Sequence, residues 1–310
     1  MTGRGPVLSR RVLGLGAVAG VATVAGCGGG SGGPSSGGGG GQDGDGAEVL
    51  RYGEDPSQLV RLSRPVGESR GLVVVLHGGF WLQEYDLSLG TPLAQDLADR
   101  GWTAANVEYR RVEGTGGYPA TLDDVSAALD VLGAAGLDTG TVVTLGHSAG
   151  GQLGVWAAGR HRLPRWAGAR VRVTHAVAQA GVLDLRAAAA QGLGNGAVQA
   201  LLGGGPQEVP EAYAAADPLT QAPVEVPVWC VHGADDGYVP LEQSAVYVRA
   251  ATAAGGVATL VDVPGDHFDL IDVGSDAWAR TVEVLDGIAP RGRAAAAGPG
   301  SGVGRPSGRG

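Results

Sequence analysis

A serine in the middle of the chain has the surroundings of a nucleophile. It lies in the segment Gly146-His147-Ser148-Ala149-Gly150, which has the spacing G-x-S-x-G. An apolar run at residues 141–145 predicts a strand before this segment, and a helix is expected after it, at residues 149–158. A serine on such a turn exposes its hydroxyl at the carboxyl end of the strand, and the flanking glycines relieve backbone crowding. We interpret Ser148 as a nucleophile; a serine that only caps a helix is the alternative.

A serine hydroxyl is a weak nucleophile near neutral pH, so it needs a neighbouring base. When the nucleophile lies on this kind of turn, the acid and then the histidine follow it along the chain. Four of the six histidines follow Ser148, and two of these four, His232 and His267, come in loops directly after predicted strands. His267 comes after the last predicted strand and is the expected base. His232 has no suitable strand-end acid before it, so His232 and His77 are expected to be structural hydrogen-bonding groups.

The acid is expected in the loop after the strand predicted at residues 226–231. This loop contains two neighbouring carboxylates, Asp235 and Asp236. One of them should face His267 Nδ1 and hold the imidazole in the required tautomer, and the other should face solvent. These arguments do not distinguish the two residues.

Acyl transfer also requires N–H groups directed at the negative charge that develops on the attacked carbonyl oxygen. The N–H of Ala149, directly after the nucleophile, is one candidate. Gly78 and Gly79, at the end of the strand predicted for residues 72–76, are the others. Phe80, Trp81 and Tyr238 are expected to line the substrate pocket, although Phe80 and Trp81 are equally compatible with packing in the core.

Alternating strands and helices are needed to position these turns. Apolar runs predict strands at residues 72–76, 103–109, 141–145, 173–177, 226–231 and 258–263. Helices are expected at residues 91–100, 118–132, 149–158, 241–254 and 278–288. This order predicts an α/β fold with a mainly parallel central sheet, helices on both faces and an antiparallel edge pair at residues 48–64.

One Ala/Gly-rich segment, residues 182–225, interrupts the alternation. We interpret it as a small cap inserted over one end of the sheet, with a single weakly amphipathic piece at residues 197–202. Residues 192–197 match a dinucleotide-binding loop superficially, but no predicted strand precedes them, so no nucleotide cofactor is expected. Asp184 is expected to cap a helix, and contact with the substrate is the alternative.

The motifs resemble those of a known family. Residues 48–290 resemble the α/β-hydrolase superfamily, and more narrowly the esterase/lipase branch that includes kynurenine formamidases. The resemblance rests on the segments His77-Gly78-Gly79-Phe80-Trp81, Gly146–Gly151, Glu108-Tyr109-Arg110-Arg111 and His267-Phe268-Asp269-Leu270. The acid motif of that branch, H-G-x-x-D-x-x-V-P, implies that Asp236 is the acid. The pattern also resembles prolyl-oligopeptidase-type catalytic domains.

The expected activity is hydrolysis of small carboxylic esters or activated amides by a Ser148–His267–Asp236 acyl-enzyme mechanism. The alternatives are a surface-tethered serine peptidase and a non-catalytic binding protein with the same fold. No metal or other cofactor is expected, because there is no H-E-x-x-H motif or cysteine cluster. With 31 acidic against 22 basic residues, all arginine, the chain is a poor match for nucleic acid. Oligomeric state is not readable from the sequence.

The first 46 residues resemble an export address. Paired arginines, Arg10 and Arg11, precede an apolar stretch at residues 12–26 that is too short to span a bilayer, as in a twin-Arg signal. The segment Val24-Ala25-Gly26-Cys27 resembles a bacterial lipobox, in which Cys27 is acylated; an ordinary cleaved signal is the alternative.

The segments that flank the domain are low in apolar side chains. Residues 28–46 contain 12 glycines and are expected to form a flexible linker. The Arg-dotted tail, residues 291–310, is expected to be disordered. The hydrolase domain, residues 47–290, is therefore expected at the outer face of a bacterial membrane, but kynurenine formamidases act on an intracellular metabolite. Export therefore puts a formamidase substrate in doubt.

Overall fold

The computed structural model describes residues 41–42 and 48–288 of the 310-residue chain. The expectations for the export signal, for Cys27 and for the C-terminal tail lie outside these residues. Two residues of the expected linker, Gly41–Gln42, form strand β1 and pair antiparallel with the next strand.

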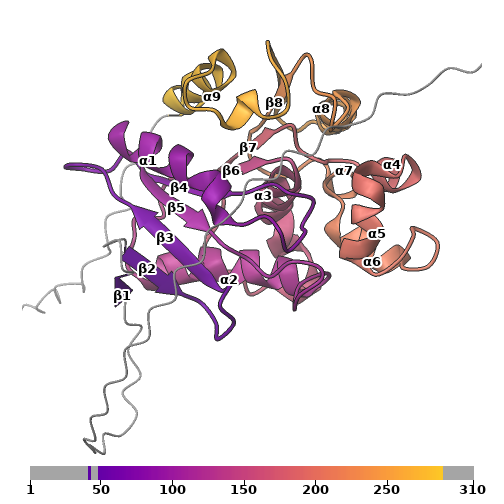
Figure 1. Cartoon of the computed structure of the whole chain (residues 1–310), viewed down its shortest axis with the longest axis horizontal. Coiled ribbons are helices and arrows are strands. Elements are labelled where there is room, and N and C mark those ends of the chain that lie inside the picture. Colours follow the sequence, from indigo (N-terminus) through magenta and orange to yellow (C-terminus); the bar gives the residue numbers. More distant parts are fainter. Residues whose placement is uncertain (1–40, 43–47, 289–310) are drawn as a thin grey trace, which may run out of the picture. The chain divides into compact units, whose positions relative to one another are not determined.

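A single sheet organises the described residues, with the order β1-β2-β3-β5-β4-β6-β7-β8-β9 (Figure 1). Its strands after β1 are β2 (Glu48–Arg51), β3 (Leu59–Ser63), β4 (Leu72–Leu76), β5 (Thr103–Val107), β6 (Val142–His147), β7 (His175–Gln179), β8 (Val228–Gly233) and β9 (Ala258–Val263). The six strands from β5 to β9 in this order are parallel, whereas β2 and β3 are antiparallel. The predicted parallel sheet and its antiparallel edge pair are confirmed.

Helices cover both faces of the sheet because its central strands are apolar on both sides. In β4, Leu72, Val74 and Leu76 belong to one apolar cluster, and Val73 and Val75 belong to another. The first cluster includes side chains of α2 (Ala120–Ala134), α3 (Ala149–Gly159) and α8 (Glu242–Ala253). The second includes side chains of α1 (Thr91–Asp99) and α9 (Asp276–Asp286). This layered arrangement confirms the expected fold class.

The interrupting segment, residues 182–225, contains more helix than the one piece expected. It forms α4 (Leu185–Ala190), α5 (Ala197–Leu202), α6 (Pro210–Ala216) and α7 (Pro218–Gln221), which are grouped at one edge of the domain in Figure 1. Side-chain caps mark the starts of two of the additional helices. The Asp184 side chain accepts the Ala187 N–H at the start of α4, as expected, and Asp217 accepts the Leu219 N–H at the start of α7.

The bounds of strand β7 differ from the prediction. Strand β7 begins and ends two residues later than the predicted run at 173–177, so its last residue is Gln179. Its register explains the shift, because Gln179 pairs with His147 at the end of β6. Within the described residues, no helix is both long enough and apolar enough to cross a bilayer.

Candidate active site

Ser148 lies on a tight turn between β6 and α3. Its backbone has φ 54° and ψ −115°, a conformation that is uncommon for residues other than glycine. A Cβ at Gly146 would lie 2.0 Å from the Gly150 carbonyl oxygen, and a Cβ at Gly150 would lie 2.0 Å from that of Leu76. Glycine is therefore required on both sides of the serine, and this requirement is the physical basis of the G-x-S-x-G pattern.

His267 is hydrogen-bonded to Asp236, with 2.7 Å between His267 Nδ1 and Asp236 Oδ2. The other carboxylate oxygen accepts the N–H groups of Tyr238 and Val239, each at 2.8 Å. Burial alone would raise the pKa of Asp236, but the hydrogen bonds from His267 and from the two N–H groups lower it below its usual value. Asp235 is exposed. Of the two neighbouring carboxylates, the one bonded to the candidate base is therefore Asp236.

Ser148 and His267 line the same pocket, which has a volume of about 80 Å³. Its other lining residues are mostly apolar: Gly79, Phe80, Tyr85, Leu89, His147, Tyr238, Phe268 and Ile271. Within the described part of the chain, the Ser148 hydroxyl makes no hydrogen bond. Catalytic hydrogen bonds are often loose before substrate binds, so the shared pocket rather than a direct bond relates the two residues here.

The candidate oxyanion N–H groups lie at the start of α3 and after β4. Among the described residues, the N–H groups of Gly78, Gly79 and Ala149 donate to no partner. Gly79 lines the pocket of Ser148, whereas Gly78 lines a separate internal cavity, so Gly79 is the better placed of the two glycines. Gly79 has φ +103°, and a Cβ there would lie 2.3 Å from the Tyr85 side chain. This position therefore requires glycine.

The expected pocket residues divide into two groups. Phe80 and Tyr238 line the pocket, and the Tyr238 ring is stacked on that of His267 with 5.4 Å between the ring centroids. Trp81 differs from the expectation, since it is only 1% exposed and its indole Nε1 donates to Gln152 Oε1. Phe80 and Trp81 both lie in a turn with positive φ, 52° and 58°, and this turn directs the Trp81 ring into the core.

Two exposed aromatic residues were not expected at the site. Tyr85 and Phe268 line the pocket together with Tyr238, and the rings of Phe268 and Tyr238 meet edge to face. Phe268 directly follows His267 in the sequence, and this position could have indicated it. Tyr85 follows shortly after the His77–Trp81 segment but belongs to none of the motifs, and no local pattern distinguishes it.

Glu108 is another residue whose role in the site appears only in the structure. Its carboxylate accepts the N–H groups of Leu87 and Tyr109, faces His77 Nε2 at 3.2 Å and forms an ion pair with Arg111. Burial opposes ionisation, but these hydrogen bonds and the charge of His77 together lower the pKa of Glu108. Glu108 therefore anchors His77, the residue that precedes the two candidate oxyanion glycines.

The two remaining strand-end histidines have the structural contacts expected of them. His77 Nδ1 lies 2.8 Å from the Gly78 carbonyl oxygen. His232 is bonded to Ser244 Oγ at 2.8 Å and to the Val239 carbonyl oxygen at 2.9 Å. Among the described residues, no group of three or more His, Cys, Asp or Glu side chains is arranged to hold a metal ion.

Many solved structures resemble this chain. Esterase B from Lactobacillus rhamnosis, inhibited by a tributyrin phosphonate, is 19% identical with a TM-score of 0.67, and the match covers 76% of this chain and 82% of that one. Thermogutta terrifontis esterase 2, phosphonylated by sarin, is 23% identical with a TM-score of 0.63, and the match covers 78% and 93%. At such identities the likeness establishes the α/β-hydrolase fold.

A bifunctional GH43-CE protein from Bacteroides eggerthii is 21% identical, with a TM-score of 0.65. The match covers 76% of this chain but 37% of that protein, so this chain spans little more than a third of its length. A search of curated proteins gives no significant match.

A family model described as BD-FAE matches residues 62–250. This range contains β4, the Ser148 turn, the inserted helices and Asp236. The resemblance to kynurenine formamidases stays a prediction, because this match does not test it. The matched range is more than half of the 310 residues, and the chain therefore belongs to the BD-FAE family.

Proposed function

We propose that the protein is a serine hydrolase that cleaves carboxylic esters or activated amides of small substrates. The observation that carries the proposal is the convergence of three turns on one pocket. Gly79, Ser148 and His267 line this pocket, Asp236 is hydrogen-bonded to His267, and the unpaired N–H of Ala149 directly follows Ser148.

In the proposed mechanism, the Ser148 hydroxyl attacks the carbonyl carbon of the substrate while His267 removes its proton. Asp236 holds the His267 ring by Nδ1 and stabilises the imidazolium that forms. The N–H groups of Gly79 and Ala149 bind the oxygen that becomes negative. The imidazolium then gives its proton to the leaving group, and His267 activates a water molecule that releases the acid from Ser148.

Two observations support esters of small acids over larger substrates. Solved structures with this fold include two esterases, one inhibited by a tributyrin phosphonate and one phosphonylated by sarin. The pocket volume of about 80 Å³ is also well below the ~300–1,000 Å³ typical of sites for drug-sized ligands. The acyl group that enters this pocket is therefore expected to be short.

The test is hydrolysis of p-nitrophenyl acetate and butyrate by the folded domain and by its Ser148→Ala variant. We expect the variant to lose about 10³-fold or more in kcat, because removing the nucleophile leaves only the oxyanion donors and binding. Ser88→Ala is the matched control, since Ser88 is an exposed serine outside this pocket. Equal rates in Ser148→Ala and the unmodified protein would refute the proposal.

A parallel panel distinguishes the substrate classes. A formanilide tests amide cleavage of the arylformamidase kind, and short proline-containing peptides test peptidase activity. Turnover of the peptides alone would favour the surface peptidase over the esterase. If the folded protein turns over none of these substrates, the non-catalytic binding protein becomes the better interpretation.

We also propose that the protein is exported and held at the outer face of the bacterial membrane by a lipid on Cys27. The support is the order of paired arginines, short apolar stretch, lipobox-like segment and glycine-rich linker in the sequence.

A further inference from the structure

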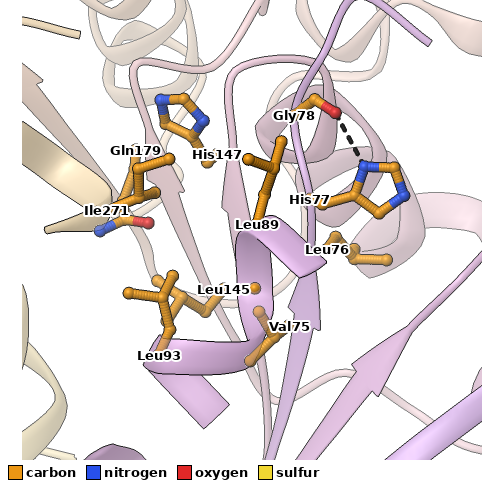
Figure 2. Close-up of a pocket in the computed structure, with 11 residues that line it drawn as sticks. Val75, Leu76, His77, Gly78, Leu89, Leu93, Leu145, His147, Gln179 and Ile271 are labelled. Atoms are coloured by element: carbon orange, nitrogen blue, oxygen red, sulfur yellow. Dashed lines mark hydrogen bonds between the residues drawn. The ribbon is translucent and has the colours of Figure 1, made fainter. Parts of the chain in front are cut away.

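Behind Ser148, two side chains at the ends of neighbouring strands face one small internal cavity. His147 ends β6 and Gln179 ends β7, and the two residues are direct partners in the parallel register. Both line a cavity of about 10 Å³ that is otherwise walled mainly by aliphatic side chains (Figure 2). We refer to His147 and Gln179 as the strand-end pair.

The strand-end pair holds the segment that carries the candidate base. His147 Nε2 lies 2.9 Å from the carbonyl oxygen of His267, and Gln179 Nε2 lies 2.6 Å from that of Leu270. In addition, the backbone carbonyl of Gln179 accepts the N–H of Ser148 at 2.8 Å. The pair therefore contacts both the nucleophile turn and the two ends of residues 267–270.

The hydrogen-bond partners determine which atom of His147 carries a proton. Since Nε2 faces a carbonyl oxygen, Nε2 must be the donor. Burial, and then the nearby charge of His267, lower the pKa of His147 to about 3, so the ring is neutral near pH 7. Its Nδ1 is therefore a bare acceptor, and this buried atom has no partner among the described residues.

The same reasoning applies to the Gln179 amide. Its Nε2 donates to Leu270 and also lies 3.2 Å from the Thr281 hydroxyl, which itself donates to the Ala277 carbonyl. The nitrogen is thus correctly assigned, and Gln179 Oε1 is the acceptor that remains. Oε1 is also buried and has no partner within residues 48–288. Each of the two strand-end residues that line the cavity therefore has one buried acceptor without a partner.

We propose that one buried water molecule occupies this cavity and donates a hydrogen to His147 Nδ1 and to Gln179 Oε1, so that the strand-end pair positions His267. A water molecule supplies two donors, which is the number that these two acceptors require. The cavity volume matches the ~10–15 Å³ that one water needs, and buried waters typically satisfy otherwise unpaired polar groups.

The water has a defined consequence for the site. By donating to Nδ1, it holds His147 in the tautomer whose Nε2–H supports the His267 carbonyl. The neighbouring oxyanion segment is fitted to the same ring, because a Cβ at Gly78 would lie 2.8 Å from His147 Nδ1. His147 and Gln179 act through His267 and Ser148, so they are positioning residues. This role in turnover rests on the proposed hydrolase function.

The kinetic test compares two substitutions of His147 in the folded domain. His147→Leu removes both ring nitrogens, whereas His147→Gln places an amide near the position of Nε2 and retains a donor for the His267 carbonyl. We expect His147→Leu to lower kcat on p-nitrophenyl acetate by about 10²-fold with KM changed much less, as displacements of about 1 Å do. His147→Gln should recover at least tenfold of this loss. Equal kcat values for the two variants would overturn the positioning role.

Two measurements on the unmodified protein test the water without activity. Nitrogen-15 NMR should show His147 as the Nε2–H tautomer with an unprotonated Nδ1. A crystal structure at atomic resolution should show a water within hydrogen-bond distance of His147 Nδ1 and Gln179 Oε1. A protonated Nδ1, or a cavity without density, would overturn the water site. If the protein hydrolyses no ester but the water is found, the hydrolase function fails while the water site stands.

Discussion

At Asp236 three hydrogen-bond donors converge on one carboxylate. The Tyr238 and Val239 N–H groups hold one oxygen, and the His267 imidazole holds the other. These bonds keep the carboxylate ionised and fix its direction, whereas its neighbour Asp235 is exposed. Two adjacent residues of the same type thus differ in role because of their contacts.

A pair of substitutions tests this difference. Asp236→Asn should lower kcat by about 10⁴-fold, because an amide group facing Nδ1 favours the wrong tautomer of His267. Asp235→Asn is the matched control and should stay close to the unmodified protein. The measurement is kcat for p-nitrophenyl acetate with both proteins checked for folding by circular dichroism. A large loss in Asp235→Asn with little loss in Asp236→Asn would reverse the assignment.

At the scale of elements, four of the loops at the carboxyl ends of the parallel strands each contribute one component of the site. The loop after β4 provides Gly79, the turn after β6 provides Ser148, and the loops after β8 and β9 provide Asp236 and His267. Parallel strands bring these loops to one edge of the sheet, which is where open α/β sheets bind their ligands.

The loop after β4 is tightly fitted. Gly79→Ala should lower kcat by about 10²-fold, because the new Cβ would lie 2.3 Å from Tyr85 at φ +103° and would displace the N–H donor. Gly67→Ala is the control: Gly67 also has positive φ, +92°, but a Cβ there would meet nothing within 4 Å. It should lose some stability and retain activity. If Gly79→Ala keeps the kcat of the unmodified protein, as Gly67→Ala should, the loop after β4 does not supply the oxyanion N–H.

The inserted helices contain a carboxylate whose pKa is raised. Asp217 is 1% exposed and accepts the N–H groups of Leu185, at 3.2 Å, and Leu219, at 3.1 Å, so it joins the starts of α4 and α7. Burial, with a contribution from the neighbouring Asp184, raises its pKa from 3.8 to about 6. The folded state therefore favours the protonated form, and the stability that Asp217 contributes is lost as pH rises through about 6.

The predicted pH dependence follows from this sign. Above pH 6 the buried carboxylate costs up to about 3 kcal/mol relative to the unfolded chain. Asp217→Asn keeps an acceptor oxygen without the charge. Its melting temperature relative to the unmodified protein should therefore be higher at pH 8 than at pH 5. Thermal unfolding at both values checks this, and a difference independent of pH would contradict it.

At the scale of the whole molecule, the acidic hydrolase domain is expected to act at a membrane surface through its N-terminal lipid. Intact-mass analysis of protein extracted from membranes should show an acylated Cys27 as the first residue of the mature chain. Cys27→Ser should abolish the acylation and release the protein from the membrane fraction. An unacylated Cys27, or cleavage at another residue, would refute the anchor.

Much of this molecule was predictable from local patterns. The bounds of β4 and β9 match the predicted runs, and α5 matches the one amphipathic piece expected in the insertion. The Ser148 turn was equally predictable, because the G-x-S-x-G spacing between a predicted strand and a predicted helix is a local pattern, although the requirement for Gly150 comes from the Leu76 carbonyl in β4. Strand β7 was placed two residues too early, because its ends depend on pairing with β6, which lies some thirty residues away.

The sequence by itself determined the parallel α/β architecture, the Ser148 turn and the expected base, since apolar periodicity and glycine-flanked turns are local properties of a chain. The acid motif already implied Asp236 by resemblance, and the tertiary structure shows its carboxylate bonded to His267. Only the tertiary structure decided that Trp81 turns into the core and that His147 and Gln179 share a cavity. These outcomes depend on contacts between residues far apart in the sequence. The directions of these side chains are set only when the strands that carry or flank them pair with their neighbours.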